Sequence, residues 1–121
     1  LKTKSRARVI PLVGYAYEAL DIVMQTSKGD FVFEKYNKNK ESKTTAASNV
    51  VSKWLKKEFN DLTAHCLRHT FRDRLRAVEC PMEIIDELGG WSTISTAGNR
   101  YGLRHKFETK LKWMEIIRID V

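Results

Sequence analysis

The chain of 121 residues is long enough for one domain with a single core, and its 22 Lys and Arg against 15 Asp and Glu give a net charge of +7. This basic balance favours a polyanionic partner, nucleic acid first, although ribosomal, membrane-surface and plain solvated proteins share it. Two cysteines are too few for a disulfide framework, and without a signal peptide or a run of about 18 apolar residues we expect a cytoplasmic protein with no membrane partner.

The beginning of the chain is predicted to form a hairpin, a helix and a short strand. The segment Arg8–Leu12 indicates the end of a strand that proline stops, because proline cannot donate to a ladder, and the charged residues before it supply the rest of an exposed hairpin. Apolar residues at helical spacing predict a helix over residues 14–26. The apolar run Phe31–Phe33 is of β type.

The remainder of the chain is predicted to be helical, with turns marked by Asn, Gly and Pro. Pro81 suits the first turn of a helix, and Gly89 with Gly90 suits a helix end. A brief helical segment is expected between Ser92 and Tyr101. The longer expected helices cover residues 44–59, capped by Thr44 or Thr45 with Val50, Val51, Trp54 and Leu55 on the apolar side, then 63–77, 81–89 and 106–119. The predicted fold class is mainly α with a small antiparallel β-sheet, in one domain.

The residues that indicate chemistry begin at His65 and Arg68, which are three apart and therefore project from one face of their predicted helix. Such a pair can grip a phosphate, because a guanidinium offers forked donors and a nearby histidine can donate or exchange a proton. Downstream of this pair, Trp91 follows two glycines and Tyr101 follows an arginine. The pattern predicts a phosphate site.

A zinc site is an alternative, since His65, Cys66, His69 and Cys80 are all possible ligands. No paired C-x-x-C is present and Cys66 faces away from the two histidines, so the pattern does not favour a metal. For His69 alone, a structural role is favoured over a catalytic one, because it points about 100 degrees away from Arg68 on a helix.

Three ordered segments resemble the tyrosine recombinases of the phage integrase kind. The run from His65 to Phe71 resembles their H-x-L-R-H-T-F box, and Leu88–Thr96 resembles their L-G-H-x-x-I-x-T-T segment with Trp91 where histidine is commoner. Asn99-Arg100-Tyr101 resembles the R-Y that presents the nucleophile, one residue further from Trp91 than in the commoner pattern. The likeness covers roughly residues 1–105.

The resemblance implies a role for each matching residue. Tyr101 would attack a DNA phosphate without a metal or cofactor, while Arg68 and His65 hold that phosphate and Trp91 donates its indole N–H. The segment before Pro11 resembles the hairpin that carries the family's catalytic lysine, for which Lys2 is chosen and Lys4 is the alternative.

The resemblance also bears on domain organisation. Residues 1–121 would be a partial catalytic domain, because the family's first catalytic arginine and its amino-terminal DNA-clamping domain lie upstream. The expected partner is double-stranded DNA, and the expected setting is the cytoplasm of a bacterial or phage-host cell.

The last predicted helix carries an apolar stripe that must be buried somewhere. Its members are Phe107, Leu111, Met114 and Ile117, with Trp113 nearby. The resemblance suggests docking on a neighbouring protomer, giving a homo-oligomer on DNA. Packing against its own domain is an equal alternative.

Three other functions remain open. One is a non-catalytic DNA-binding fragment of an integrase, and a second is a type IB topoisomerase or hairpin-forming resolvase, which uses a similar residue set. The third is a small helical interaction protein with an incidental basic surface, which would leave the three ordered segments unexplained.

Overall fold

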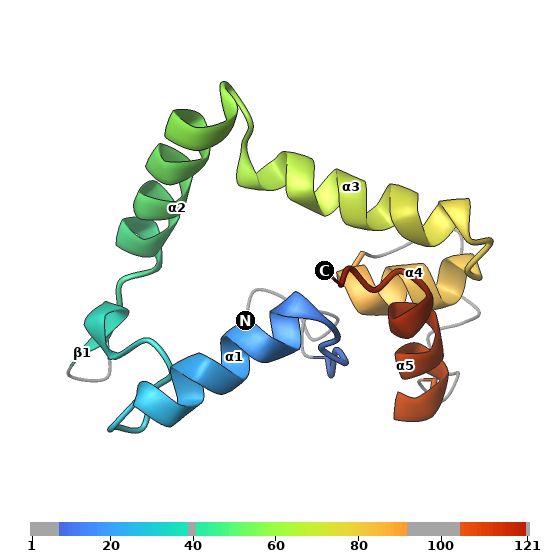
Figure 1. Cartoon of the computed structure of the whole chain (residues 1–121), viewed down its shortest axis with the longest axis horizontal. Coiled ribbons are helices and arrows are strands. Elements are labelled where there is room, and N and C mark those ends of the chain that lie inside the picture. The colour runs from blue at the N-terminus through green and yellow to red at the C-terminus, as the bar shows by residue number, and fades with distance from the viewer. Residues whose placement is uncertain (1–7, 39–40, 92–104, 121) are drawn as a thin grey trace. The chain divides into compact units, whose positions relative to one another are not determined.

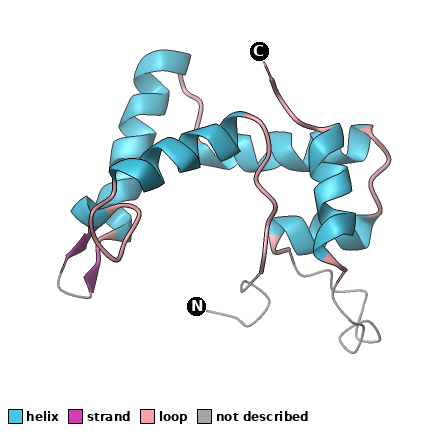
Figure 2. Cartoon of the chain, turned by 60° about the horizontal axis from the view of Figure 1, so that its bottom comes forward, coloured by secondary structure: helices cyan, strands magenta, loops and turns pink. Residues whose placement is uncertain are grey.

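A computed structural model describes residues 8–38, 41–91 and 105–120, and these are built mainly of helices (Figures 1 and 2). The five longer predicted helices are confirmed, with ends that differ from the expected ones by a few residues at most, and the brief helical segment expected between Ser92 and Tyr101 lies outside the described residues. The helices are α1 (Tyr15–Thr26), the 3₁₀ turn η2 (Glu34–Tyr36), α2 (Thr44–Phe59), α3 (Ala64–Ala77), α4 (Met82–Gly89) and α5 (Phe107–Ile116).

The predicted α+β fold class is wrong, because residues 8–12 form no strand. Their backbone is held by long side chains instead of a ladder. The Nζ atom of Lys110 donates to the Val9 carbonyl at 3.1 Å, and Nε of Arg8 donates to the Leu88 carbonyl at 2.9 Å. Phe31–Phe33 is likewise a bend and turn that leads into η2.

Extended pairing in the described residues amounts to two segments of two residues each, drawn in magenta in Figure 2. They are β1 (Asn37–Lys38) and β2 (Glu41–Ser42), which pair antiparallel. This pairing closes a turn and is too short to make a sheet with a face to bury. The part of the chain that the structure describes is therefore essentially helical.

The chain divides into two compact units. Unit 1 comprises residues 1–15 and 70–121, and unit 2 comprises residues 16–69. Unit 1 holds a continuous apolar core in which α4 and α5 lie beside the end of α3 (Figure 1). The buried core residues are Leu75, Cys80, Ile84, Ile85, Leu88, Met114 and Ile117, with Ile10, Val13, Phe71, Val78, Trp91 and Trp113 packed around them.

Helix α4 begins and ends where its sequence predicts. Pro81 is its N-cap, and Gly90 is its C-cap in the left-handed conformation with φ 64°. The backbone N–H groups of Gly90 and Trp91 both donate to the Asp86 carbonyl, which closes the last turn. The helix buries Ile84, Ile85 and Leu88, so it supplies much of the core of unit 1.

Helix α5 packs on its own unit, which bears out the second of the two expected fates of its apolar stripe. Met114 and Ile117 are buried as predicted, but Phe107 is 47% exposed and the third buried residue of this face is Lys110. The Lys110 stem lies in the protein while its ammonium reaches Val9, a common arrangement for long cationic side chains.

The residues after α5 also lie against unit 1. Arg74 donates to the Ile117 carbonyl at 2.7 Å. Gly14 has φ +53°, and a Cβ built on it would lie 2.5 Å from the Ile119 carbonyl oxygen. Glycine is therefore required at position 14 both by its backbone conformation and by the close approach of the chain.

Unit 2 buries far less apolar surface than unit 1. Among its described residues only Leu55 is buried, although the sequence predicted a wider apolar side for α2. Trp54 is 54% exposed and packs edge to face on Phe59, with ring centroids 5.6 Å apart. The N-cap of α2 is Lys43, and its side chain makes no capping hydrogen bond, so the predicted threonine cap is also wrong.

Within the described parts of the chain, no helix is both long enough and apolar enough to cross a membrane.

Replacing Lys110 tests whether its buried stem and its hydrogen bond hold the amino-terminal segment. We expect Lys110→Ala to lower the free energy of unfolding by about 2–3 kcal/mol, because packing and a charge-assisted hydrogen bond are both lost. Urea denaturation measures this loss. The matched control is Lys112→Ala on the same helix, whose exposed ammonium lies over the Trp113 ring and whose loss should stay below about 1 kcal/mol. Equal losses would contradict the structural role of Lys110.

Candidate phosphate-binding site

Three of the five predicted site residues, His65, Arg68 and Trp91, lie in the part of the chain that the structure describes. Lys2 and Tyr101 lie outside the described residues, as does Lys4. The site is therefore described in two parts, one formed by the first residues of α3, which belong to unit 2, and the other by the rest of α3 and the end of α4, which belong to unit 1.

Helix α3 carries His65 and Arg68 three residues apart, so they project from the same helical face as predicted. The His65 side chain is exposed, and Arg68 is half-buried. The His65 ring also meets the His69 ring edge to face, with centroids 4.4 Å apart and planes at 89°. This contact between successive helical turns restricts the His65 ring, a role for His69 that its four-residue spacing from His65 could have indicated.

The two cysteines have thiols in different environments. Burial raises the pKa of Cys80 to about 11, so this thiol stays protonated and is a poor metal ligand at neutral pH. At the start of α3, a side-chain hydrogen bond with Thr63, 3.4 Å between Oγ1 and Sγ, lowers the pKa of Cys66. Among the residues described, no group of three or more His, Cys, Asp or Glu is placed to hold a metal ion.

Trp91 follows the end of α4 and its ring folds back over the helix. A Cβ on Gly89 would overlap the six-membered part of the Trp91 indole, so glycine at this position is what lets the ring lie there. A Cβ on Gly90 would lie 2.5 Å from the Arg8 guanidinium. The double glycine thus serves two functions, closing the helix and seating the tryptophan.

Arg72 of α3 stacks on Trp91, a contact that the sequence did not reveal. Its guanidinium carbon lies 5.2 Å from the centroid of the Trp91 ring, within the range of a cation–π interaction. Its terminal nitrogen lies 4.0 Å from Oδ1 of Asp86. Spacing along the chain gives no signal for this cluster, because Arg72 and Trp91 are on separate elements.

Asp86 is held in a partly desolvated position, with only 12% of its side chain exposed. Burial raises the pKa of its carboxyl, and the positive charges of Arg72 and Arg76 oppose that shift without cancelling it. The carboxylate is therefore disfavoured by its surroundings and is held by neighbouring guanidinium groups.

His105, the first described residue after position 104, binds Glu87 of α4. Its backbone N–H lies 3.2 Å from each carboxylate oxygen, and its Nδ1 lies 2.7 Å from Oε1. These contacts join the start of α5 to α4. Trp91 and His105, the described residues on either side of positions 92–104, therefore both lie near the end of α4.

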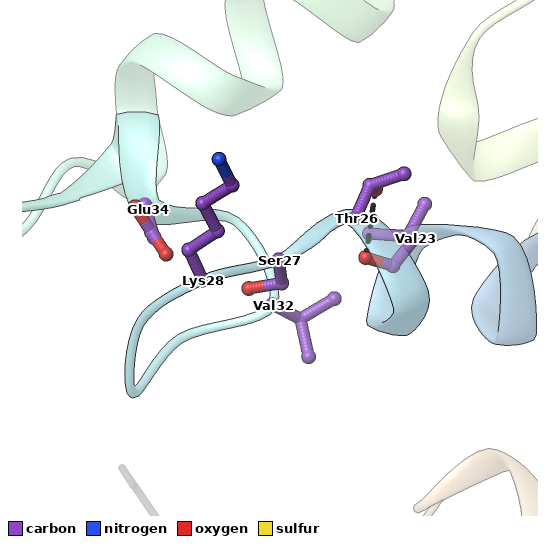
Figure 3. Close-up of a pocket in the computed structure, with 6 residues that line it drawn as sticks. All are labelled: Val23, Thr26, Ser27, Lys28, Val32 and Glu34. Carbon is purple, nitrogen blue, oxygen red and sulfur yellow. Dashed lines mark hydrogen bonds between the residues drawn. The ribbon is translucent and has the colours of Figure 1, made fainter.

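The predicted concavity shared by His65, Arg68 and Trp91 stays a prediction, since the two histidine-box residues belong to unit 2 and Trp91 belongs to unit 1. A hollow of about 280 Å³ is present within unit 2, lined by residues of α1 and of the loop after it (Figure 3). None of the predicted site residues lines it. Its lining is Val23, Thr26, Ser27, Lys28, Val32 and Glu34.

Comparison with known proteins finds one family. The chain matches the family described as the phage integrase family over residues 1–111. This span includes all three ordered segments and the amino-terminal lysines. Neither a curated protein nor a solved structure matches the chain.

Adding a methyl group at Gly89 tests the seating of Trp91. Gly89→Ala should move the Trp91 indole N–H resonance in a ¹H–¹⁵N spectrum, because the new Cβ and the ring cannot occupy the same space. We expect a net loss of about 1 kcal/mol in unfolding free energy, overpacking being offset in part by better helix propensity. Gly29→Ala is the control, since its Cβ meets the flexible Glu34 side chain. An unchanged Trp91 resonance would show that the ring lies elsewhere.

The raised pKa of Asp86 predicts a pH dependence of stability. The folded state favours the protonated carboxyl, so its contribution is present below the ordinary value of 3.8 and is lost as pH rises through the raised value. Asp86→Asn does not titrate at this position. Relative to this variant, the wild-type chain should lose stability as pH rises from below 3.8 through the raised pKa of Asp86. Thermal unfolding across this pH range measures the difference, with Asp73→Asn on α3 as an exposed control. A wild-type chain that instead gains stability would mean that the arginines outweigh burial.

Proposed function

Since the chain belongs to the phage integrase family of tyrosine recombinases, we propose that it cuts and rejoins DNA at specific sites through a 3′-phosphotyrosyl intermediate. The observation that carries the proposal is the placement of His65 and Arg68 on one face of α3, where neither side chain is buried. Membership of this family implies binding to DNA, and the net charge of +7 suits a polyanionic partner.

The reaction begins with Tyr101. Its phenolic oxygen forms a bond to the scissile phosphorus as the bond from phosphorus to the 5′ oxygen breaks. The strand then carries a 3′-phosphotyrosyl link and the leaving strand ends in a 5′-hydroxyl. Attack by a partner strand's 5′-hydroxyl reverses these bonds, so no external energy source is needed for rejoining.

Each remaining residue acts on the phosphate or on a proton. Arg68 donates to the nonbridging oxygens, whose charge grows in the transition state, and His65 binds the phosphate or moves the tyrosine's proton. Lys2 gives a proton to the leaving 5′ oxygen, and the Trp91 indole donates to the phosphate. No step uses a metal ion or a cofactor.

The proposed assembly is a homo-oligomer on double-stranded DNA, acting in the cytoplasm of a bacterial or phage-host cell. Because Met114 and Ile117 of α5 are buried within unit 1, docking on a neighbouring protomer would use the apolar residues that this end of the chain leaves exposed. These are Phe107, Ile116 and Ile119, which are 47%, 50% and 55% exposed.

Removal of the tyrosine hydroxyl tests the proposed reaction. Incubation with a DNA substrate nicked beside the cut site traps the covalent adduct, which denaturing gels detect. Tyr101→Phe should abolish the adduct and leave DNA affinity unchanged, since only the nucleophilic oxygen is lost. Tyr17→Phe, at an exposed position of α1, should form the adduct normally.

Three outcomes would overturn the proposal. An adduct formed by Tyr101→Phe would place the nucleophile elsewhere. DNA binding without any adduct, by protein that includes the upstream catalytic arginine expected for the family, would favour a non-catalytic DNA-binding protein. Activity should also persist in EDTA, and its loss would indicate a metal enzyme.

A further inference from the structure

The orientation of Trp91 is restricted by contacts with two elements. At the end of α4, Gly89 leaves the space that the indole occupies, and the Trp91 backbone N–H donates to the Asp86 carbonyl at 3.0 Å. From α3, the Arg72 guanidinium carbon lies 5.2 Å from the ring centroid. An indole N–H donates along one direction in the ring plane, so whatever sets the plane also sets where that hydrogen bond can point.

Arg72 is itself held in a way that leaves its planar group against the indole. Its terminal nitrogen contacts Met82 Sδ at 3.9 Å and Asp86 Oδ1 at 4.0 Å, and its side chain is 33% exposed. Within the described residues, Nε of Arg72 and Oδ1 of Asp86 are buried and have no hydrogen-bond partner. A bidentate ion pair, the usual way for arginine to meet a carboxylate, is therefore not formed.

This geometry is uncommon for an arginine whose only task is an ion pair. A lysine would meet the charge of Asp86 equally well, since it is a point charge, but it has no planar face to stack on an indole. The partly desolvated carboxylate holds the guanidinium near α4 by charge, and the guanidinium lies over the indole ring. Asp86 thus acts on Arg72, and Arg72 acts on Trp91.

We propose that Arg72 is a positioning residue for Trp91: its guanidinium, held by Asp86, sets the plane of the indole so that the N–H meets the scissile phosphate. The contact between Arg72 and Trp91 lies within unit 1, whereas the hydrogen bond from the indole to the phosphate rests on the proposed function. Arg72 does not itself touch DNA in this scheme. Its loss should lower the rate of adduct formation and leave DNA affinity unchanged.

The test combines a structural and a kinetic measurement on the full chain. Arg72→Met keeps the length of the stem, and Arg72→Lys keeps the charge without the planar face. Both should shift the Trp91 indole N–H resonance, identified from its absence in Trp91→Phe, while the Trp54 resonance stays in place. Arg76→Met, which removes another positive charge near Asp86 from the same helix, should leave the Trp91 resonance nearly unchanged.

Adduct formation on the nicked substrate should fall about three- to tenfold in Arg72→Met and in Arg72→Lys, because both variants lose the planar guanidinium that lies over the indole. In a Trp91→Phe background the same substitutions should cause no further fall of this size, because the arginine acts through the indole. Arg72→Lys should therefore form the adduct as slowly as Arg72→Met. If only the positive charge of Arg72 mattered, Arg72→Lys would form it at the wild-type rate.

Different failures have different meanings. An unshifted Trp91 resonance in both Arg72 variants overturns the positioning role, whatever the enzyme does. A fall in DNA affinity that matches the fall in rate, and that persists in Trp91→Phe, means that Arg72 binds DNA directly. If wild-type protein that includes the upstream catalytic arginine forms no adduct, the proposed function fails, while the resonance shifts still decide whether Arg72 orients Trp91. If Arg72→Met does not fold, the Trp91 resonance and the rate of adduct formation are measured on Arg72→Lys alone.

Discussion

Unit 1 depends on long cationic side chains that donate to carbonyl groups of other elements. Arg8 reaches the Leu88 carbonyl in the last turn of α4, Arg74 reaches the Ile117 carbonyl at the end of α5, and Lys110 reaches the Val9 carbonyl. The last carbonyls of a helix have no partner within it and carry partial negative charge, so a cation there satisfies them and opposes the helix dipole. Some of the chain's basic residues thus stabilise the fold. Fewer basic side chains are therefore available to contact DNA than the net charge suggests.

These contacts also decide where the tryptophan of the candidate site lies. Trp91 comes directly after the turn that Arg8 and the two glycines close, and Arg72 reaches it from α3. The same stretch of α4 provides Asp86 to the arginine and Glu87 to His105. Helix α4 therefore supplies buried residues to the core of unit 1 and also the two carboxylates that contact Arg72 and His105.

The helices were predictable because their signals are local. Apolar periodicity located α1, α2 and α5, the turn before residue 63 located the start of α3, and Pro81 and the Gly89–Gly90 pair marked the ends of α4. The absence of a strand at residues 8–12 could not be predicted, because the group that binds the Val9 carbonyl is the side chain of a lysine 101 residues further along the chain. Alternating apolar and polar residues indicate backbone pairing between neighbouring strands. A single side chain that binds a backbone carbonyl in place of a paired strand produces no such periodic pattern. The same reason explains why the buried face of α5 includes Lys110, whereas nothing in the sequence pattern distinguishes the exposed Val50 and Trp54 of α2 from its buried Leu55.

The candidate site divides in the same way. The shared face of His65 and Arg68 followed from helical spacing, whereas the stacking of Arg72 on Trp91 joins two elements and required the structure. The roles of Lys2 and Tyr101 rest on family resemblance alone.

Gly14 constrains how this chain can diverge. Its positive φ and its closeness to the Ile119 carbonyl each exclude a side chain, and the two constraints arise from parts of the sequence more than a hundred residues apart. Relatives that keep the carboxyl-terminal residues packed in this way should keep glycine at position 14. Relatives with another residue there should also have changed or released the segment after α5, so that the two positions covary.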